Sequence, residues 1–232
     1  MQIETKCIHS GGDTDTISRG LNTPIFPSSA HEYLDAEEVV YPRYFNTINQ
    51  QAIAQKICDL EQAEAGIVFS SGMAATSTVL LSFLKAGDHI ILQDEIYGGS
   101  HAFVTTFFER FGVTYSFVAT DANSIESAIK PETRIIYIET PTNPLLSIID
   151  IQAVAEIAKR HNCITVIDNT FATPICQNPI KLGIDIVLHS GTKYLGGHSD
   201  LCCGAVVTTS DLNAKIKKTA VNFVGIFRNK RL

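Results

Sequence analysis

From residue 46 onward the sequence alternates between short apolar runs and longer segments with a helical period. The apolar runs are Gly66–Phe69, His89–Leu92, Arg134–Ile138, Ile164–Ile167 and Ile184–Leu188, and the helical segments between them are Ala74–Lys85, Ser100–Phe111 and Ile151–His161. Strands that are apolar on both faces are typical of parallel sheets covered by helices. The alternation therefore predicts an α/β fold built around a mostly parallel sheet.

The first 45 residues have no sustained helical or strand period and are rich in Ser, Thr, Pro and Gly. This composition predicts an extended arm over residues 1–45. A helix is expected to begin at Thr47–Gln50, because Thr-x-x-Gln is a capping box. Ile53, Ile57 and Leu60 follow at helical spacing and predict its buried face. The α/β domain is therefore expected to span residues 46–223.

Charge and composition argue against nucleic acid and membrane partners. The formal net charge is −6, and like charges do not form long runs. The stretch Met1–Lys6 lacks the apolar core of a signal peptide, and the longest apolar runs are too short to cross a bilayer. With 45% hydrophobic residues the chain falls in the globular range. We therefore expect a soluble, cytoplasmic protein that acts on a small molecule.

The chain contains 6 cysteines, which form no Cys-x-x-Cys pair and show no metal-ligand spacing. Free cysteine usually behaves as a small buried hydrophobe. We therefore expect buried free thiols and no metal site. The adjacent pair Cys202 and Cys203 lies near the proposed active loop, but its predicted role is also to line the core.

Polar residues follow the predicted strands where each one ends. The four segments are Ser70–Met73, Glu139–Pro144, Asp168–Thr170 and His189–Lys193. In open α/β sheets, ligands bind beyond the carboxyl ends of the strands. These segments are thus predicted to bring phosphate donors, an acid and an amine to one edge of the sheet.

Each residue type at this edge suits a phosphorylated, aromatic cofactor. Gly72 opens a predicted helix, whose N–H groups and dipole attract phosphate, and the hydroxyls of Ser190 and Thr192 precede Lys193, a nucleophile if it is desolvated. Asp168 could pair with a pyridinium nitrogen. Each also has a structural interpretation: small residues that make turns, a solvated lysine and an aspartate that caps a helix.

One aromatic residue and one basic residue could complete such a site. Tyr97 follows an apolar run and could stack on a cofactor ring, although a core tyrosine is the alternative. Arg43 could clamp a phosphate through its guanidinium group, although a solvent-exposed arginine is equally compatible with its position.

Six short motifs follow one another along the chain, and their order and spacing are informative as a set. They are Tyr41-Pro42-Arg43, Ser70-Ser71-Gly72-Met73-Ala74-Ala75, Tyr97-Gly98-Gly99, Glu139-Thr140-Pro141-x-Asn143-Pro144, Asp168-Asn169-Thr170-Phe171 and Ser190-Gly191-Thr192-Lys193-Tyr194. This set resembles the Cys/Met metabolism family of pyridoxal-phosphate (PLP) enzymes from about Thr5 to about Phe223. The resemblance implies the large domain of a fold type I PLP-dependent transferase, with a mostly parallel seven-stranded-type sheet flanked by helices.

The resemblance also implies a role for each site residue. Lys193 would form the Schiff base with pyridoxal 5'-phosphate and, with Tyr97, take part in catalysis, while Asp168 would pair with the pyridine nitrogen. The remaining assignments are ring stacking by Tyr97, phosphate binding by Gly72, Met73, Ser190 and Thr192, contact with the phenolic oxygen by Asn143, and support by Glu139 and Thr170. Tyr41 and Arg43 would reach the phosphate of a neighbouring subunit, which implies a homodimer with a shared site, usually within a homotetramer.

The implied activity is trans-sulfuration of a sulfur-containing or O-acylated amino acid. The expected chemistry is γ-elimination or γ-replacement, as in cystathionine γ-lyase or γ-synthase. Cystathionine β-lyase and methionine γ-lyase chemistry remain alternatives. Methionine γ-lyases commonly carry a cysteine where this chain has Gly99, which makes that specificity less favoured.

The resemblance is expected to end after Phe223. Residues 224–232 are interpreted as an atypical tail, and the C-terminal small domain of the family is expected to be absent. In family members that domain supplies the arginine that binds the substrate carboxylate. A cofactor-binding remnant without turnover is therefore an alternative of a different class. A nucleotide-binding domain is disfavoured, because no Gly-x-Gly-x-x-Gly turn follows a strand.

Overall fold

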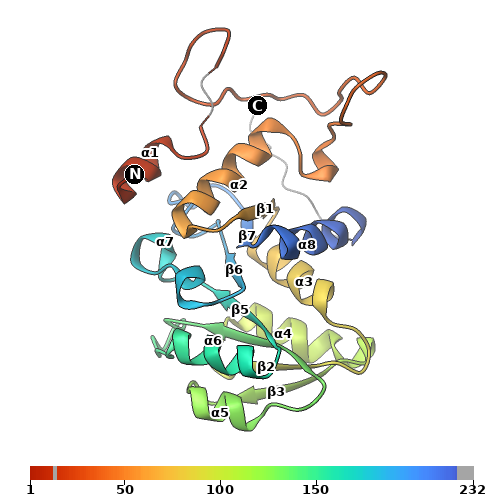
Figure 1. Ribbon diagram of the computed structural model, residues 1–232, viewed down its shortest axis with the longest axis vertical. Coiled ribbons are helices and arrows are strands. Elements are labelled where there is room, and N and C mark those ends of the chain that lie inside the picture. Colours follow the sequence, from red (N-terminus) through yellow and green to blue (C-terminus); the bar gives the residue numbers. More distant parts are fainter. Residues whose placement is uncertain (13–14, 224–232) are drawn as a thin grey trace.

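A seven-stranded sheet forms the centre of the molecule in a computed structural model that describes residues 1–12 and 15–223 (Figure 1). In spatial order the strands are β1 (Ala65–Phe69), β7 (Gly204–Thr208), β6 (Ile186–His189), β5 (Ile164–Asp168), β4 (Thr133–Glu139), β2 (His89–Gln93) and β3 (Thr114–Val118). Neighbouring strands run parallel, except that β7 is antiparallel to both β1 and β6. The predicted α/β fold with a mostly parallel, seven-stranded sheet is confirmed.

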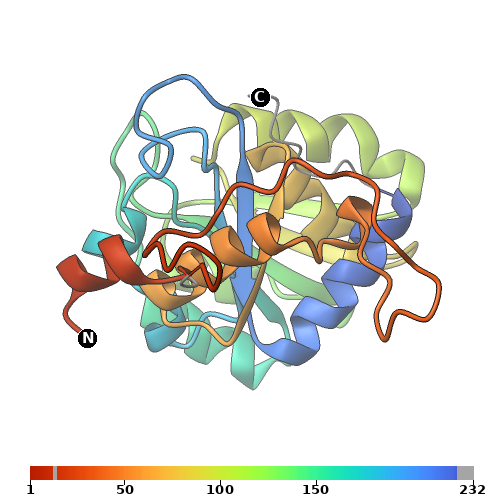
Figure 2. The ribbon, with the colours of Figure 1, turned by 90° about the horizontal axis from the view of Figure 1, so that it is seen from above.

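Helices cover both faces of the sheet (Figure 2). One core cluster joins the sheet to α3 (Gly72–Phe83), α4 (Gly98–Phe107) and α8 (Ser210–Phe223). The other joins it to α2 (Ile48–Glu61), α5 (Ala122–Ser127) and α6 (Ile151–Arg160). Successive residues of β4 alternate between the two clusters, because side chains on a strand point to opposite faces. The remaining helical turns are α1 (Ile3–His9), α7 (Thr173–Cys176), η1 (Pro42–Tyr44), η2 (Glu109–Phe111) and η3 (Pro179–Leu182).

Helix α2 begins where the capping box predicts. The Thr47 backbone N–H donates to Gln50 Oε1 at 3.2 Å, and the Thr47 hydroxyl lies 2.9 Å from the same oxygen. Ile57 and Leu60 are buried and Ile53 is partly buried, as their spacing predicts. The local sequence thus fixes both the start of the helix and the face that packs on the sheet.

Several elements were not predicted, among them β3, β7, α1, α5 and α8. Strand β3 lies at the edge of the sheet and is only half buried, so its sequence lacks a continuous apolar run. Strand β7 is short and follows a polar loop. Helix α1 falls within the arm, which otherwise contains neither helix nor strand before η1 among its described residues. The tail at 224–232 lies outside the described residues.

All 6 cysteines are free, as expected, but only half of them are buried. Cys58, Cys163 and Cys203 are buried, as predicted. The other three, Cys7, Cys176 and Cys202, are exposed, which corrects the expectation that the thiols are buried. Cys202 and Cys203 therefore differ: adjacent residues in an extended segment point in opposite directions, so only one of them can line the core.

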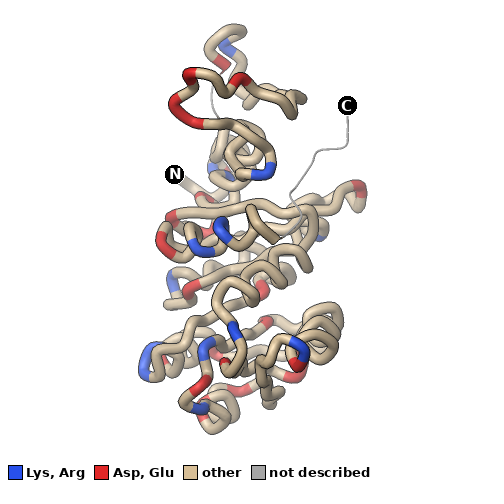
Figure 3. Tube along the Cα trace, turned by 90° about the vertical axis from the view of Figure 1, so that its right-hand side faces the viewer, with Lys and Arg blue, Asp and Glu red and all other residues tan. Residues whose placement is uncertain are grey.

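Charged residues of both signs are interspersed over the elements (Figure 3). Within residues 1–12 and 15–223, no helix is long and apolar enough to span a membrane.

Candidate functional site

The strand directions bring the predicted motifs to one edge of the sheet. Strands β4, β5 and β6 are parallel, so Glu139, Asp168 and His189 all lie at their carboxyl ends. Strand β1 also ends at this edge, because β7 is antiparallel to both of its neighbours. The start of α3, the loop after β6 and the first residue of β7, Gly204, therefore meet there.

The N-terminus of α3 packs directly against the turn that contains Ser190. Ser71 caps the helix by accepting a hydrogen bond from the Ala74 N–H at 3.1 Å. A Cβ atom on Gly72 would lie 2.8 Å from Ser190 Cβ, closer than side-chain atoms approach. Only glycine allows this approach, which places hydroxyl and helix N–H donors side by side. That donor set fits a phosphate group.

Replacing Gly72 with alanine should therefore disturb this contact more than the fold. We expect a loss of about 1–3 kcal/mol in the free energy of unfolding, typical of overpacking, and about tenfold weaker binding of pyridoxal phosphate. Gly98→Ala is the matched control, because Gly98 also opens a helix at this edge but has no atom within 4 Å of an added Cβ. Equal effects of the two substitutions on cofactor titration would contradict the assignment.

Lys193 lies in a tight turn after β6, with an exposed side chain. Its backbone N–H donates to the Ser190 carbonyl oxygen at 3.0 Å. The Thr192 hydroxyl accepts from the Cys203 N–H at 3.0 Å and donates to the Cys203 carbonyl oxygen at 3.1 Å. Thr192 thus fastens the turn to the segment before β7, and its predicted contact with phosphate stays a prediction.

Asp168 is linked to the Ser190 turn through Thr170. The Thr170 N–H donates to Asp168 Oδ1 at 3.0 Å, and the Ser190 N–H donates to Thr170 Oγ1 at 2.7 Å. Burial raises the pKa of the Asp168 carboxyl, and the hydrogen bonds from Thr170 oppose this effect. A cationic ring nitrogen would stabilise a carboxylate in such a place, so the site fits a pyridinium.

Glu139 holds two predicted site residues through their backbone. Its carboxylate accepts hydrogen bonds from the N–H of Tyr97 at 2.7 Å and of Asn143 at 3.0 Å. Glu139 also pairs in register with Asp168 on the neighbouring strand. Burial, and secondly the charge of Asp168, raise the pKa of Glu139 to about 7. The supporting role predicted for Glu139 thus has a geometric basis.

The raised pKa of Glu139 predicts how stability without cofactor depends on pH. Between the ordinary glutamate value and about 7, the folded state binds more protons than the unfolded state, so the free energy of unfolding falls as pH rises. A Glu139→Gln variant lacks this titration. Relative to wild type, it should gain about 2–3 kcal/mol between about pH 4.5 and pH 8 in urea unfolding. A difference that does not change with pH would contradict this expectation.

Tyr97, Met73 and Gly99 lie together between α3 and α4. A Cβ atom on Gly99 would lie 2.4 Å from Tyr97 Cε1 and 3.1 Å from Met73 Sδ. The Tyr97 ring is half exposed, so a face of it is available to a ligand. Any side chain at position 99, a cysteine included, would therefore displace this ring.

The structure does not bring Tyr41 and Arg43 into contact with the strand-end residues. Arg43 Nε donates to the Val221 carbonyl oxygen of α8 at 2.8 Å. The exposed Tyr41 ring packs edge-on against Tyr44, with 5.4 Å between ring centroids. Their predicted contact with a neighbouring subunit stays a prediction.

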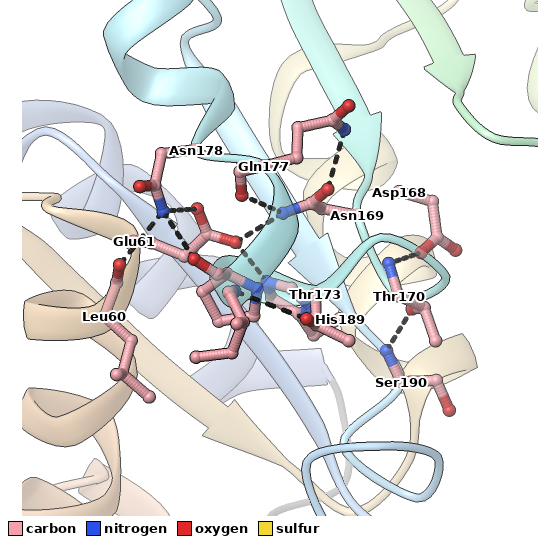
Figure 4. Close-up of polar contacts among 12 residues, drawn as sticks. Leu60, Glu61, Asp168, Asn169, Thr170, Thr173, Gln177, Asn178, His189 and Ser190 are labelled. Atoms are coloured by element: carbon pink, nitrogen blue, oxygen red, sulfur yellow. Dashed lines mark hydrogen bonds and ion pairs between the residues drawn. The ribbon is translucent and has the colours of Figure 1, made fainter. Parts of the chain in front are cut away.

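Sequence reasoning missed a buried polar network beneath the site (Figure 4). Glu61 Oε1 lies 2.6 Å from His189 Nε2 and accepts from Asn169 Nδ2 at 2.7 Å. Gln177 and Asn178 complete the network through Asn169 and Glu61. Asn169 and His189 do stand in the strand-end segments, but Glu61 lies in a helix far away in sequence and carries no motif signal.

The chain is similar to proteins of one family along almost all of its length. The family described as Cys/Met metabolism PLP-dependent enzyme matches residues 4–229, which extends past the predicted end of the resemblance at Phe223. Cystathionine β-lyase from Lactococcus lactis subsp. cremoris and cystathionine γ-lyase from Bacillus subtilis (strain 168) are each 44% identical over 213 residues. Each alignment covers 90% of this chain but only 56% of the relative.

A solved structure shows the same fold. Cystathionine γ-lyase from Lactobacillus plantarum, complexed with L-serine, has a TM-score of 0.93 and 41% sequence identity. The comparison covers 98% of this chain and 60% of that chain. The present chain therefore spans little more than half the length of the relatives that it matches.

Proposed function

Because the chain belongs to the Cys/Met metabolism family of PLP-dependent enzymes, we propose that it binds pyridoxal 5'-phosphate at the strand-end edge and bonds to it covalently through Lys193. One observation carries this proposal. The Thr170 N–H donates to the Asp168 carboxylate and the Ser190 N–H donates to the Thr170 hydroxyl oxygen, which joins the acid to the turn that contains Lys193. The acid, the phosphate donors and the amine thus belong to one connected site.

The remaining residues have roles that follow from where they lie. Gly72 and Met73, at the N-terminus of α3, and the Ser190 turn would hold the phosphate. Asp168 would hold the proton on the ring nitrogen. Tyr97 would cover the ring, and Asn143 would face its phenolic oxygen, since Glu139 fixes the backbone of both residues.

The proposed reaction is γ-elimination or γ-replacement on a small sulfur-containing or O-acylated amino acid. The bound cofactor supplies an electron sink for charge that develops at the substrate Cα. Lys193 Nζ, on its exposed side chain, would take the proton from Cα, give it up again, and then, as a neutral amine, take one from Cβ. The Tyr97 hydroxyl assists departure of the γ-substituent. β-Elimination requires only the first proton removal and is the second candidate, favoured by the cystathionine β-lyase relative.

We further propose a homodimer with a shared site, assembled as a homotetramer in the cytoplasm. Arg43 binds the Val221 carbonyl oxygen of α8 and Tyr41 packs on Tyr44, so their predicted phosphate contact needs a second subunit. The arm also exposes large apolar side chains, including Ile17, Leu21 and Leu34. Such exposed apolar groups are typical of a surface that another chain covers.

The test is to titrate the full chain with pyridoxal phosphate and then add cystathionine. A new visible absorbance band with saturable binding would support the cofactor site. Cleavage on the γ side releases cysteine, whereas cleavage on the β side releases homocysteine, so analysis of the thiol product distinguishes the two candidates. Cofactor binding that is accompanied neither by thiol release from cystathionine nor by thiol consumption with O-acylhomoserine would favour the remnant without turnover. Absence of the band in folded protein would contradict the proposal.

A further inference from the structure

We propose that Glu61, Asn169 and His189 are positioning residues for the cofactor site: they fix the two turns that carry Asp168 and Ser190, and they hold the His189 imidazole close to Asp168. This inference rests on the proposed function, because it concerns how the same site is held ready for pyridoxal phosphate. All three residues are buried, so they would act on the cofactor through the residues that hold it.

The network is fully enclosed by the protein. Glu61 and Asn169 are 0% exposed and His189 is 1% exposed. Burying a carboxylate costs several kcal/mol unless it is paired and hydrogen-bonded. Glu61 meets this requirement with the His189 ring and the Asn169 side-chain amide. Such an arrangement is stable only if all of its members are in place.

The network is joined to the cofactor site through the backbone. Asn169 directly follows Asp168, and its N–H donates to the Leu188 carbonyl oxygen at 2.9 Å. His189 directly precedes Ser190, whose N–H donates to Thr170 Oγ1. Figure 4 shows Asp168, Thr170 and Ser190 beside the network that contains Glu61, Asn169 and His189. A shift of the His189 ring or of the Asn169 amide would therefore move the acid and the phosphate cradle together.

The second contribution is electrostatic. Glu61 Oε1 and His189 Nε2 are 2.6 Å apart, a separation typical of a charge-assisted hydrogen bond. The titratable groups that face Asp168 are His189 on β6 and Glu139 and Tyr137 on β4. Of these, only His189 favours the ionised form of Asp168. With a neutral residue at position 189, the charged neighbour of the Asp168 carboxylate would be Glu139, which disfavours the ionised form of Asp168.

The test compares His189→Gln with His89→Gln in the full chain. His89 is the matched control, because it is also fully buried on a strand of this sheet and hydrogen-bonded at both ring nitrogens, but it lies at the opposite ends of the strands. Each variant is titrated with pyridoxal phosphate from about pH 5 to pH 8, and each is unfolded in urea without cofactor. The chain has no Trp, so the absorbance and induced circular dichroism of the cofactor are the signals.

His189→Gln should weaken cofactor binding about tenfold and move the acid-side loss of affinity to higher pH, because Asp168 then protonates more readily. Glu61→Gln should shift the pH profile in the same direction. His89→Gln should lose stability but keep the wild-type affinity and pH profile. If His189→Gln binds as wild type does, or if both histidine variants change alike, the inference is wrong. If wild type itself binds no cofactor, the proposed function fails and the inference fails with it.

Discussion

A Lys193→Ala variant should lose covalent attachment of the cofactor completely while keeping the fold. The Lys193 side chain is exposed, so its removal should change the free energy of unfolding by less than about 0.5 kcal/mol. The acid and the phosphate cradle remain, so non-covalent binding should persist at lower affinity. The expected spectrum is that of free aldehyde held in the site, without the new visible band.

The measurement is absorbance together with mass spectrometry after borohydride reduction, which makes an amine linkage permanent. Lys181→Ala is the control, since Lys181 is an exposed lysine outside the strand-end edge. That variant should gain the mass of one reduced cofactor, as wild type does. Equal mass gain in the Lys193 and Lys181 variants would place the attachment on another lysine and contradict the assignment.

An Asp168→Asn variant should bind the cofactor about 10- to 100-fold more weakly, yet be more stable than wild type when no cofactor is present. The affinity falls because a charge-assisted hydrogen bond to the ring nitrogen, worth about 1.5–3 kcal/mol, is lost. The stability rises because burial raises the pKa of Asp168, so the ionised form is disfavoured in the folded state. A site held at the expense of stability is typical of functional residues.

The sign of the pH effect separates this account from a simple loss of packing. The folded state holds the Asp168 proton to higher pH than the unfolded state, so the cost of the carboxylate appears as pH rises. The gain in melting temperature of Asp168→Asn should therefore be large at about pH 8 and vanish at about pH 4. A variant that is less stable at both values would show that Asp168 acts as a structural hydrogen-bonding residue instead.

Much of the fold follows from local pattern. The apolar runs became β1, β2, β4, β5 and β6, because each is buried on both faces. The site followed from the same reasoning, since parallel strands must bring residues such as Glu139 and Asp168 to one edge. The motif order then predicted which polar residues share a cofactor, a step that the strand pattern alone does not supply.

The features that sequence did not predict depend on contacts between distant segments. Strand β7 begins where Gly204 lies close to the Ser71 carbonyl oxygen, and an added Cβ there would lie 2.0 Å from that oxygen. Glu61 is separated from its partner His189 by most of the chain, and in sequence it resembles a solvated helix residue. Neither a propensity nor a periodicity describes such pairs, because tertiary packing creates them.

The most direct test of the central claim is to treat the wild-type chain with pyridoxal phosphate and borohydride and to map the modified peptide. The account predicts one modification per chain, on the peptide that contains Lys193. Its yield should fall in the Gly72→Ala variant and stay unchanged in Gly98→Ala. Modification spread over several surface lysines, with yields that neither substitution changes, would contradict the claim that the strand-end edge is a cofactor site.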